Sequence, residues 1–157
     1  LSKAYALPGL RIGWAVAPES TADDLWARHE YTTIDATMLS NKLAALALSP
    51  EVRPRILART RGYIRQGYPV LDAWMESHEN TFSLTPPGAA AIAFVRYHLD
   101  INSTEFAERL RKEKSTLIVP GDHFGMDHLV RISFGLPHDY LLGALDRIHE
   151  LVVELGG

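Results

Sequence analysis

The sequence contains no cysteine among its 157 residues. This absence excludes disulfide bridges, thiolate metal sites and a cysteine nucleophile together. The sequence also lacks any apolar run of the roughly 18 residues that a membrane-spanning helix needs. We therefore expect no membrane partner, and the lack of cysteine is compatible with the cytoplasmic location that we expect.

The sequence has neither an initiator methionine nor the features of a signal peptide, which are a basic start, an apolar run and a small-residue cleavage site. It opens directly inside a motif that is described below. We therefore expect it to be the C-terminal portion of a longer protein. Its length is enough for about one domain or one and a half.

An excess of positive charge is also absent. The 16 basic and 19 acidic residues leave a net charge of -3 at pH 7, which argues against nucleic acid as a partner. The densest basic run extends from Arg53 to Arg65, but it carries no set of interleaved aromatic residues on which bases could stack. We interpret this run as the solvated face of a helix that links two parts of the chain.

The seven histidines do not replace the missing cysteines as metal ligands. The pairs Asp122-His123 and Asp127-His128 match no zinc template, and no His-Glu-x-x-His motif is present. We interpret these histidines as loop or packing residues and predict no metal site. A serine hydrolase is not expected either, because the sequence has no Gly-x-Ser-x-Gly motif.

What the sequence does contain begins at its start. Lys3 precedes Arg11 by eight residues, and Pro8-Gly9 is expected to turn the chain between them. From residue 10 to residue 17, large apolar side chains alternate with Arg11 and three small residues. This period of two predicts a strand on which Arg11 is the only large side chain of its face. A lone cation above such a shallow surface can receive an anion such as phosphate.

This segment resembles the lysine segment of the fold-type I, pyridoxal-phosphate-dependent enzymes, the aminotransferase class I/II family. In that family Ser-Lys is followed, after a short run, by Pro-Gly-Leu-Arg-x-Gly. Ser2-Lys3, Pro8-Gly9-Leu10-Arg11 and Gly13 match this pattern in type and spacing. The resemblance implies that Lys3 is the catalytic lysine that forms a Schiff base with pyridoxal 5'-phosphate. It also implies that Arg11 binds the phosphate of this cofactor.

A second string resembles the same family, in which Pro-Gly-x-x-Phe-Gly is followed by Arg-[Ile/Leu]-Ser-Phe. Residues 120–125 and 131–134 match it, in the expected order after the first string. In the family this arginine binds the α-carboxylate of the substrate, so the resemblance makes Arg131 the substrate-binding residue. A guanidinium suits this role because its two parallel N–H donors determine both position and orientation of a carboxylate.

Apolar periodicity and turn residues predict the remaining elements. The first expected helix starts at Thr21 and runs through 24–28. Further helices are expected over 38–48, 50–75 and 103–114, and a last helix opens at 137. The expected strands cover 81–85, 90–97, 116–119 and 129–134. The helix over 38–48 is apolar on nearly all sides, which predicts burial in a larger body or against a partner chain. Residues 31–37 are expected to form a loop, and the resemblance suggests that Tyr31, Thr32 or Thr33 reaches the phosphate of a neighbouring subunit.

The predicted fold class is α/β, in three parts. By resemblance, residues 1–49 form the end of a large pyridoxal-phosphate-binding domain, and residues 50–79 form a long connecting helix. Residues 80–157 form a small C-terminal domain, in which alternating strands and helices predict an open sheet covered on one face by helices. The turn at 88–90 lies where members of the family run a strand past the substrate.

The function implied by the resemblance is transfer of an amino group between an amino acid and a 2-oxo acid, by a full-length protein that forms a homodimer. Decarboxylases, lyases, cyclases and acyl-condensing synthases of fold type I share the same lysine and arginine pattern, so these alternatives stay open. The effector domain of a transcription regulator and a non-catalytic binding module stay open as well. In the family, residues upstream of the lysine complete the cofactor site, so the 157-residue polypeptide alone is not expected to be active.

Overall fold

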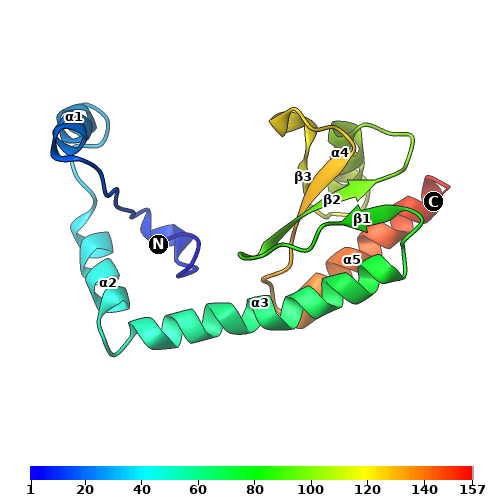
Figure 1. Cartoon of the computed structure of the whole chain (residues 1–157), viewed down its shortest axis with the longest axis horizontal. Helices are drawn as coiled ribbons and strands as arrows, with labels where there is room; N and C mark the ends of the chain where they lie inside the picture. Colours follow the sequence, from blue (N-terminus) through cyan, green and yellow to red (C-terminus); the bar gives the residue numbers. More distant parts are fainter. Residues whose placement is uncertain (157) are drawn as a thin grey trace. The chain divides into compact units, whose positions relative to one another are not determined.

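The computed structural model of the protein describes residues 1–156, which divide into two compact units. The first unit comprises Leu1–Thr60, and the second begins at Arg61. The helix α3 (Arg53–Glu76) contributes to both units, and Figure 1 shows the order of the elements along the chain. The division expected from the sequence, at residues 49 and 79, stays a prediction.

The first unit is helical. It contains a short 3-10 helix, η1 (Pro8–Leu10), followed by α1 (Glu19–His29), α2 (Met38–Leu48) and the first turns of α3. The bounds of α2 are those predicted, and Thr37 caps this helix because its side chain accepts a hydrogen bond from the backbone N–H of Ser40. Residues 31–37 form the expected connection between α1 and α2.

The strand expected over residues 10–17 is not formed, and this prediction was wrong. These residues adopt no regular structure after η1, and the side chains of Trp14 and Val16 are 63% and 93% exposed. A strand requires a neighbouring strand that accepts and donates its backbone hydrogen bonds. Within residues 1–156, no segment pairs with this stretch in a sheet. The alternating pattern of residues 10–17 therefore does not form a strand, because no neighbouring strand within the described residues pairs with it.

Two helix starts differ from the prediction. The helix α1 begins at Glu19 rather than at Thr21, directly after Pro18, whose fixed backbone angle leads the chain into the first turn. The helix α3 begins at Arg53 rather than at residue 50, because Ser49 ends α2 and its hydroxyl accepts a hydrogen bond from the N–H of Val52. Pro69 lies inside α3 without ending it.

Burial of α2 differs from the expectation as well. Only Ala44 and Ala47 of this helix are buried, whereas Met38 and Leu39 are 73% and 69% exposed. The described residues therefore do not cover the apolar sides of α2. The arginines of the basic run on α3 are all exposed, as a solvated face requires: Arg53, Arg55, Arg59, Arg61 and Arg65.

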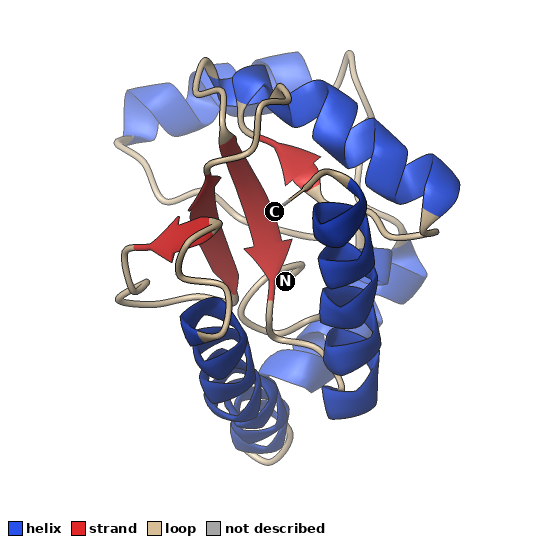
Figure 2. Cartoon of the chain, turned by 90° about the vertical axis from the view of Figure 1, so that its right-hand side faces the viewer, coloured by secondary structure: helices blue, strands red, loops and turns tan. Residues whose placement is uncertain are grey.

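The second unit is built around an antiparallel sheet of four strands, shown in red in Figure 2. The strands are β1 (Phe82–Leu84), β2 (Ile92–Tyr97), β3 (Val119–Pro120) and β4 (Leu129–Ser133), in the order β1-β2-β4-β3. The predicted strands over 81–85, 90–97 and 129–134 are present as β1, β2 and β4, and the mixed α/β fold class is confirmed. The strand predicted over 116–119 is largely wrong, because β3 shares only Val119 with it and residues 116–118 form no strand.

Helices α3, α4 (Ser103–Glu113) and α5 (His138–Glu154) supply the side chains that pack with the sheet in one hydrophobic core. Buried and more exposed positions alternate along β2, so that Ala93, Val95 and Tyr97 belong to this core. None of the helices within residues 1–156 is long and apolar enough to cross a membrane.

One glycine lets α3 approach the sheet. A Cβ atom on Gly67 would overlap the backbone carbonyl of Phe134, which directly follows β4. The helix can reach this position only because residue 67 has no side chain. The ring of Phe134 packs edge-on against Tyr68 of the same helix, at 5.5 Å between ring centroids.

Candidate functional site

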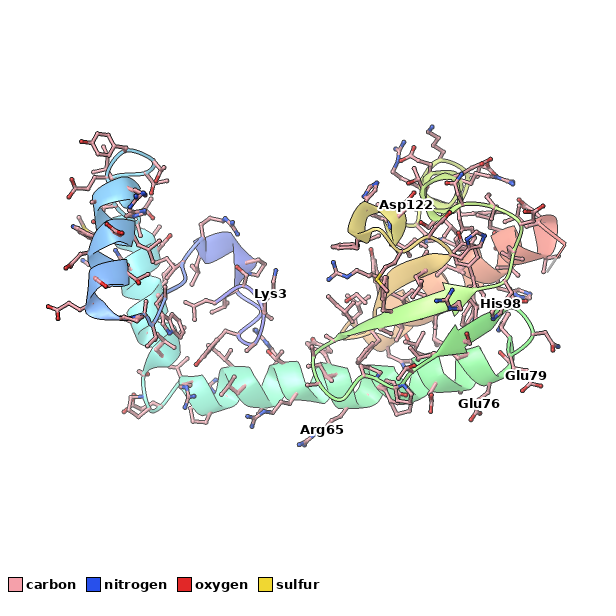
Figure 3. All side chains as sticks on the ribbon, turned by 45° about the horizontal axis from the view of Figure 1, so that its top comes forward. Lys3, Arg65, Glu76, Glu79, His98 and Asp122 are labelled. Carbon is pink, nitrogen blue, oxygen red and sulfur yellow. The ribbon has the colours of Figure 1, made fainter. Side chains whose placement is uncertain are left out.

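Lys3 lies in a tight loop that is closed by its own backbone. The N–H of Ala6 donates to the carbonyl of Lys3 over 2.9 Å, and the N–H of Leu7 donates to the carbonyl of Leu1 over 3.2 Å. Ala6 adopts a left-handed conformation with φ of 50° to close this loop. The lysine side chain is exposed and is labelled in Figure 3.

Arg11 directly follows η1 and is held by Pro8. Its backbone N–H donates to the carbonyl of Pro8 over 3.2 Å, and its Nη1 donates to the same oxygen over 3.0 Å. Arg11 itself is left-handed, with φ of 50°. The Pro-Gly turn predicted from the sequence is therefore a 3-10 turn that ends in the arginine. The remaining N–H groups of the guanidinium stay available to an anion.

The structure brings Lys3 and Arg11 to the same open hollow, which measures about 410 Å³. The other residues that line it are apolar or uncharged, and none of them is acidic. An amine and a guanidinium without a compensating carboxylate favour an anionic ligand. The hollow therefore offers a phosphate group a cation and offers an aldehyde an amine.

Two arginines of α3 hold the loop that carries Lys3. The Nε of Arg53 donates to the phenolic oxygen of Tyr5 over 2.9 Å, and Nη2 of Arg59 donates to the backbone carbonyl of Tyr5 over 3.1 Å. Sequence reasoning missed both contacts, since the partners are 48 and 54 positions apart and no local pattern connects them.

Arg131 lies in the second unit, on β4 in the middle of the sheet. Its partners in the register are Phe94 on β2 and Val119 on β3, so that an apolar side chain flanks it on each side. Arg131 is half-buried, and its guanidinium carbon lies 5.1 Å from the centre of the Phe124 ring. The side-chain hydrogen bonds and ion pairs found within residues 1–156 do not include Arg131.

The loop that carries Phe124 depends on two glycines of the second sequence string. The 3-10 helix η2 (Asp122–Phe124) starts after Gly121 and ends at Gly125, which is left-handed with φ of 71°. A Cβ atom on Gly121 would overlap the carbonyl of Met126, so only glycine fits there. The N–H of Phe124 donates to the carbonyl of Gly121 over 2.8 Å.

Polar contacts fasten this loop to the start of α4, beside Asp122, which is labelled in Figure 3. The hydroxyl of Thr104 donates to Oδ2 of Asp122 over 2.5 Å, and the N–H of Asp122 donates to the hydroxyl of Ser103 over 3.0 Å. The hydrogen bond from Thr104 is the main reason why the pKa of Asp122 is lowered. At the other end of the loop, Oδ1 of Asp127 accepts the N–H of Ser103 over 2.7 Å.

The start of α4 has a separate capping residue. The capping residue is Asn102, whose side chain accepts the N–H of Glu105 over 2.9 Å. The hydroxyl groups of Ser103 and Thr104 are free to hold the loop instead. Of the two histidines weighed as metal ligands, His128 stacks on Tyr97 with 5.4 Å between ring centroids, and His123 is exposed.

The remaining candidate positions lie in the loop over residues 31–33 and in the turn at 88–90. Tyr31 is 92% exposed, and the hydroxyl of Thr33 lies 3.1 Å from Nδ1 of His29. In the turn at 88–90, Ala90 is left-handed with φ of 74°. Lys3 and Arg11 thus line one hollow of the first unit, whereas Arg131 belongs to the second unit.

Comparison with known proteins places these residues in context. The model of a protein family described as "Aminotransferase class I and II" matches residues 1–148. Capreomycidine synthase from Streptomyces vinaceus is 33% identical over 159 aligned residues, which cover 99% of this chain and 39% of that protein. Aromatic-amino-acid aminotransferase 2 from Thermococcus litoralis is 27% identical over 98% of this chain and 40% of that protein.

Solved structures agree with these relatives. A PLP-dependent aminotransferase from Streptococcus suis matches with a TM-score of 0.89 and 32% identity, over 99% of this chain and 41% of that chain. The PLP-dependent cyclase OrfR matches with a TM-score of 0.87 and 29% identity, over 98% of this chain and 42% of that chain. The chain therefore spans about two fifths of the length of the proteins that it matches.

Proposed function

Since this chain belongs to the aminotransferase class I and II family, we propose that it supplies the catalytic lysine and two anion-binding arginines of an aminotransferase. The homologues and structural neighbours of this chain are pyridoxal-phosphate-dependent. The reaction that we propose transfers an amino group between an amino acid and a 2-oxo acid. The observation that carries the proposal is the shared hollow of Lys3 and Arg11, which no acidic residue lines.

The residues of this hollow fit pyridoxal 5'-phosphate. Arg11 would hold the phosphate through the guanidinium donors that Pro8 does not use. Lys3 would hold the aldehyde carbon through its amine. The bound cofactor supplies an electron sink for the electrons released at the substrate Cα.

The chain's own residues would then orient the substrate and move its proton. Arg131 would bind the α-carboxylate through two parallel N–H donors, which determines how the bonds at Cα are directed. Lys3 would take the proton from Cα as a general base and return it as a general acid. Both roles require Lys3 to lie at a fixed position, and the backbone hydrogen bonds that close its loop restrain it there.

Chemical trapping of the full-length protein tests this function. Reduction with borohydride in the presence of pyridoxal phosphate, followed by peptide mapping, should place the pyridoxyl label on Lys3. The Lys3→Ala variant should lose both the label and transfer from amino acids to 2-oxoglutarate. A label on another lysine, or a Lys3→Ala variant with unchanged absorbance and turnover, would contradict the proposed role.

A cyclase or synthase is the second candidate, because two relatives favour it. One is capreomycidine synthase, at 33% identity, and the other is the cyclase OrfR, with a TM-score of 0.87. The two reactions differ in their need for a co-substrate. An aminotransferase consumes a 2-oxo acid and releases a new amino acid, whereas cyclisation of an amino acid proceeds without one. Mass analysis of products with and without 2-oxoglutarate separates the two.

The same proposal includes the oligomeric state and cellular location of the full-length protein and the activity of the 157-residue polypeptide. We expect the full-length enzyme to be a cytoplasmic homodimer, which light scattering and cell fractionation would test. We expect the 157-residue polypeptide alone not to bind the cofactor productively, because its lysine hollow is open to solvent. A borohydride-trappable adduct at Lys3 together with turnover by this polypeptide would overturn that expectation.

A further inference from the structure

We infer that Phe124 is a positioning residue for Arg131, holding the guanidinium by its ring face so that every N–H edge stays free for a substrate carboxylate. The inference rests on the proposed function, since it assumes that Arg131 binds a carboxylate. Phe124 lies in the second sequence string, seven positions before Arg131.

An aromatic ring, rather than a charged group, lies against Arg131. Within residues 1–156, its guanidinium is absent from the ion pairs and side-chain hydrogen bonds, so no carboxylate directs it. A flexible side chain without such a partner samples many rotamers. The ring of Phe124 lies against the guanidinium instead, at 5.1 Å from the guanidinium carbon to the ring centre. Aromatic faces attract guanidinium groups at this distance.

The contact with Phe124 leaves the N–H donors of Arg131 available. An acidic partner would orient the arginine but would occupy the N–H donors that a substrate carboxylate needs. A ring face attracts the flat side of the guanidinium and leaves its donor edges unoccupied. Phe94 and Val119, which are opposite Arg131 on the neighbouring strands, offer no competing acceptor in their side chains either. The surroundings of Arg131 therefore orient it without neutralising it.

The placement of Phe124 on its loop also favours a role at Arg131. The ring is 52% exposed, so burial in the core does not explain its position. The loop nevertheless holds it firmly, through the contacts of Asp122 with Ser103 and Thr104 of α4. An exposed aromatic residue on an anchored loop suits a role at Arg131 better than a role in stability.

The test uses the full-length holoenzyme and two substitutions of Phe124. Phe124→Leu keeps an apolar side chain but removes the ring face, and Phe124→Tyr keeps the face. Met126→Leu is the matched control, because Met126 lies in the same loop, is 46% exposed and has no proposed role. Circular dichroism and thermal melting of each variant establish that it is folded. Titration of the cofactor's visible absorbance measures amino-acid binding without requiring turnover.

For Phe124→Leu we expect the Kd and KM of the amino acid to rise by about 2- to 30-fold, with kcat changed by less than about twofold. Phe124→Tyr and Met126→Leu should behave like the wild type. Reaction with an amine that has the same side chain but no carboxylate should not respond to Phe124→Leu. In combination with Arg131→Lys, the effect of Phe124→Leu should largely disappear, because the two residues act through one contact.

Two results would overturn the inference. One is an unchanged Kd for the amino acid in Phe124→Leu, and the other is an equal loss for the amine without a carboxylate. The latter would mean that the ring contacts the substrate side chain instead. Arg131→Lys separates this inference from the proposed function. If Arg131→Lys leaves amino-acid binding unchanged, the carboxylate role of Arg131 itself fails. If only Phe124→Leu has no effect, the positioning role alone fails.

Discussion

The phenolic oxygen of Tyr5 accepts a hydrogen bond from Nε of Arg53 over 2.9 Å, although the two residues are 48 positions apart. Arg59 reinforces this contact by donating to the backbone carbonyl of Tyr5. Tyr5 lies two positions after Lys3, so the basic helix α3 restrains the loop of the proposed catalytic lysine. The sequence alone predicts only a solvated helix face for the arginine run, but two of its arginines thus have a structural role.

The contact between Arg59 and Tyr5 predicts how firmly this loop is held. Arg59→Ala removes a hydrogen bond of about 0.5–1.5 kcal/mol, so backbone amides of residues 3–11 should exchange with solvent about 2- to 10-fold faster. Hydrogen–deuterium exchange of the full-length protein measures this. Arg55→Ala is the control, because Arg55 is exposed on the same helix and makes no side-chain hydrogen bond within residues 1–156. Equal exchange in the two variants would contradict the prediction.

Two glycines of α3 predict opposite effects of the same substitution. Gly67→Ala should destabilise the protein by about 3 kcal/mol, because the new methyl group would overlap the carbonyl of Phe134 and force the helix away from the sheet. Gly62→Ala should stabilise it by about 0.5–1 kcal/mol, because nothing lies within 4 Å of the new methyl group and alanine favours a helix. Denaturant unfolding monitored by circular dichroism compares the two variants. Equal stabilities would show that α3 packs differently.

The buried hydroxyl of Tyr97 predicts the cost of an unpaired carbonyl. It donates to the carbonyl of Ile101 over 2.7 Å, and burial is the main cause of a pKa raised above the ordinary value of this phenol. Tyr97→Phe should lower the free energy of unfolding by about 1–3 kcal/mol, since the carbonyl loses its partner. Tyr140→Phe, at a residue that is 68% exposed, should change it by less than about 0.5 kcal/mol. Chemical denaturation of both variants measures the difference.

An exposed ion-pair cluster on α4 predicts the response to acid. The hydrogen bond from Arg111, followed by that from Lys112, lowers the pKa of Glu108 from 4.5 to about 2. The folded state thus binds this proton less readily than the unfolded state. The contribution of Glu108 to stability is present above pH 4.5 and is lost as the pH falls toward 2.

Comparison of the wild type with Glu108→Gln tests this pH dependence. The difference in unfolding free energy should be largest above pH 4.5, should shrink as the pH falls toward 2, and should be smaller in about 1 M salt, because exposed charges are screened. Glu76→Gln is the control, since Glu76 is exposed on α3 and takes part in no ion pair within residues 1–156. A difference that grows on acidification would reverse the assigned sign.

Much of the second unit follows from local pattern. Alternating side chains over 81–85 predict β1, which forms because it pairs with β2 in the sheet. The same pattern over residues 10–17 predicts a strand that does not form, since no described segment pairs with it. Period alone thus predicts which side chains share a face, but pairing decides whether a strand exists.

In the two sequence motifs, too, the reactive side chains can be recognised from the sequence, but the contacts that support them cannot. Residue types and spacing single out Lys3, Arg11 and Arg131, because their chemistry is visible in the side chains themselves. Their supports are not visible, since Tyr5 meets Arg53, and Phe124 meets Arg131, only after the chain has folded.

The sequence by itself determined the family, the helix over 38–48, the strands β1, β2 and β4, and the charged groups of the candidate site, since these depend on side-chain type and local spacing. Only the tertiary structure decided which groups meet. It brought Lys3 and Arg11 into one hollow, directed the hydroxyls of Ser103 and Thr104 to Asp122, and set Arg131 against an aromatic ring. Contacts between distant residues depend on how whole elements pack, and no local pattern encodes that packing.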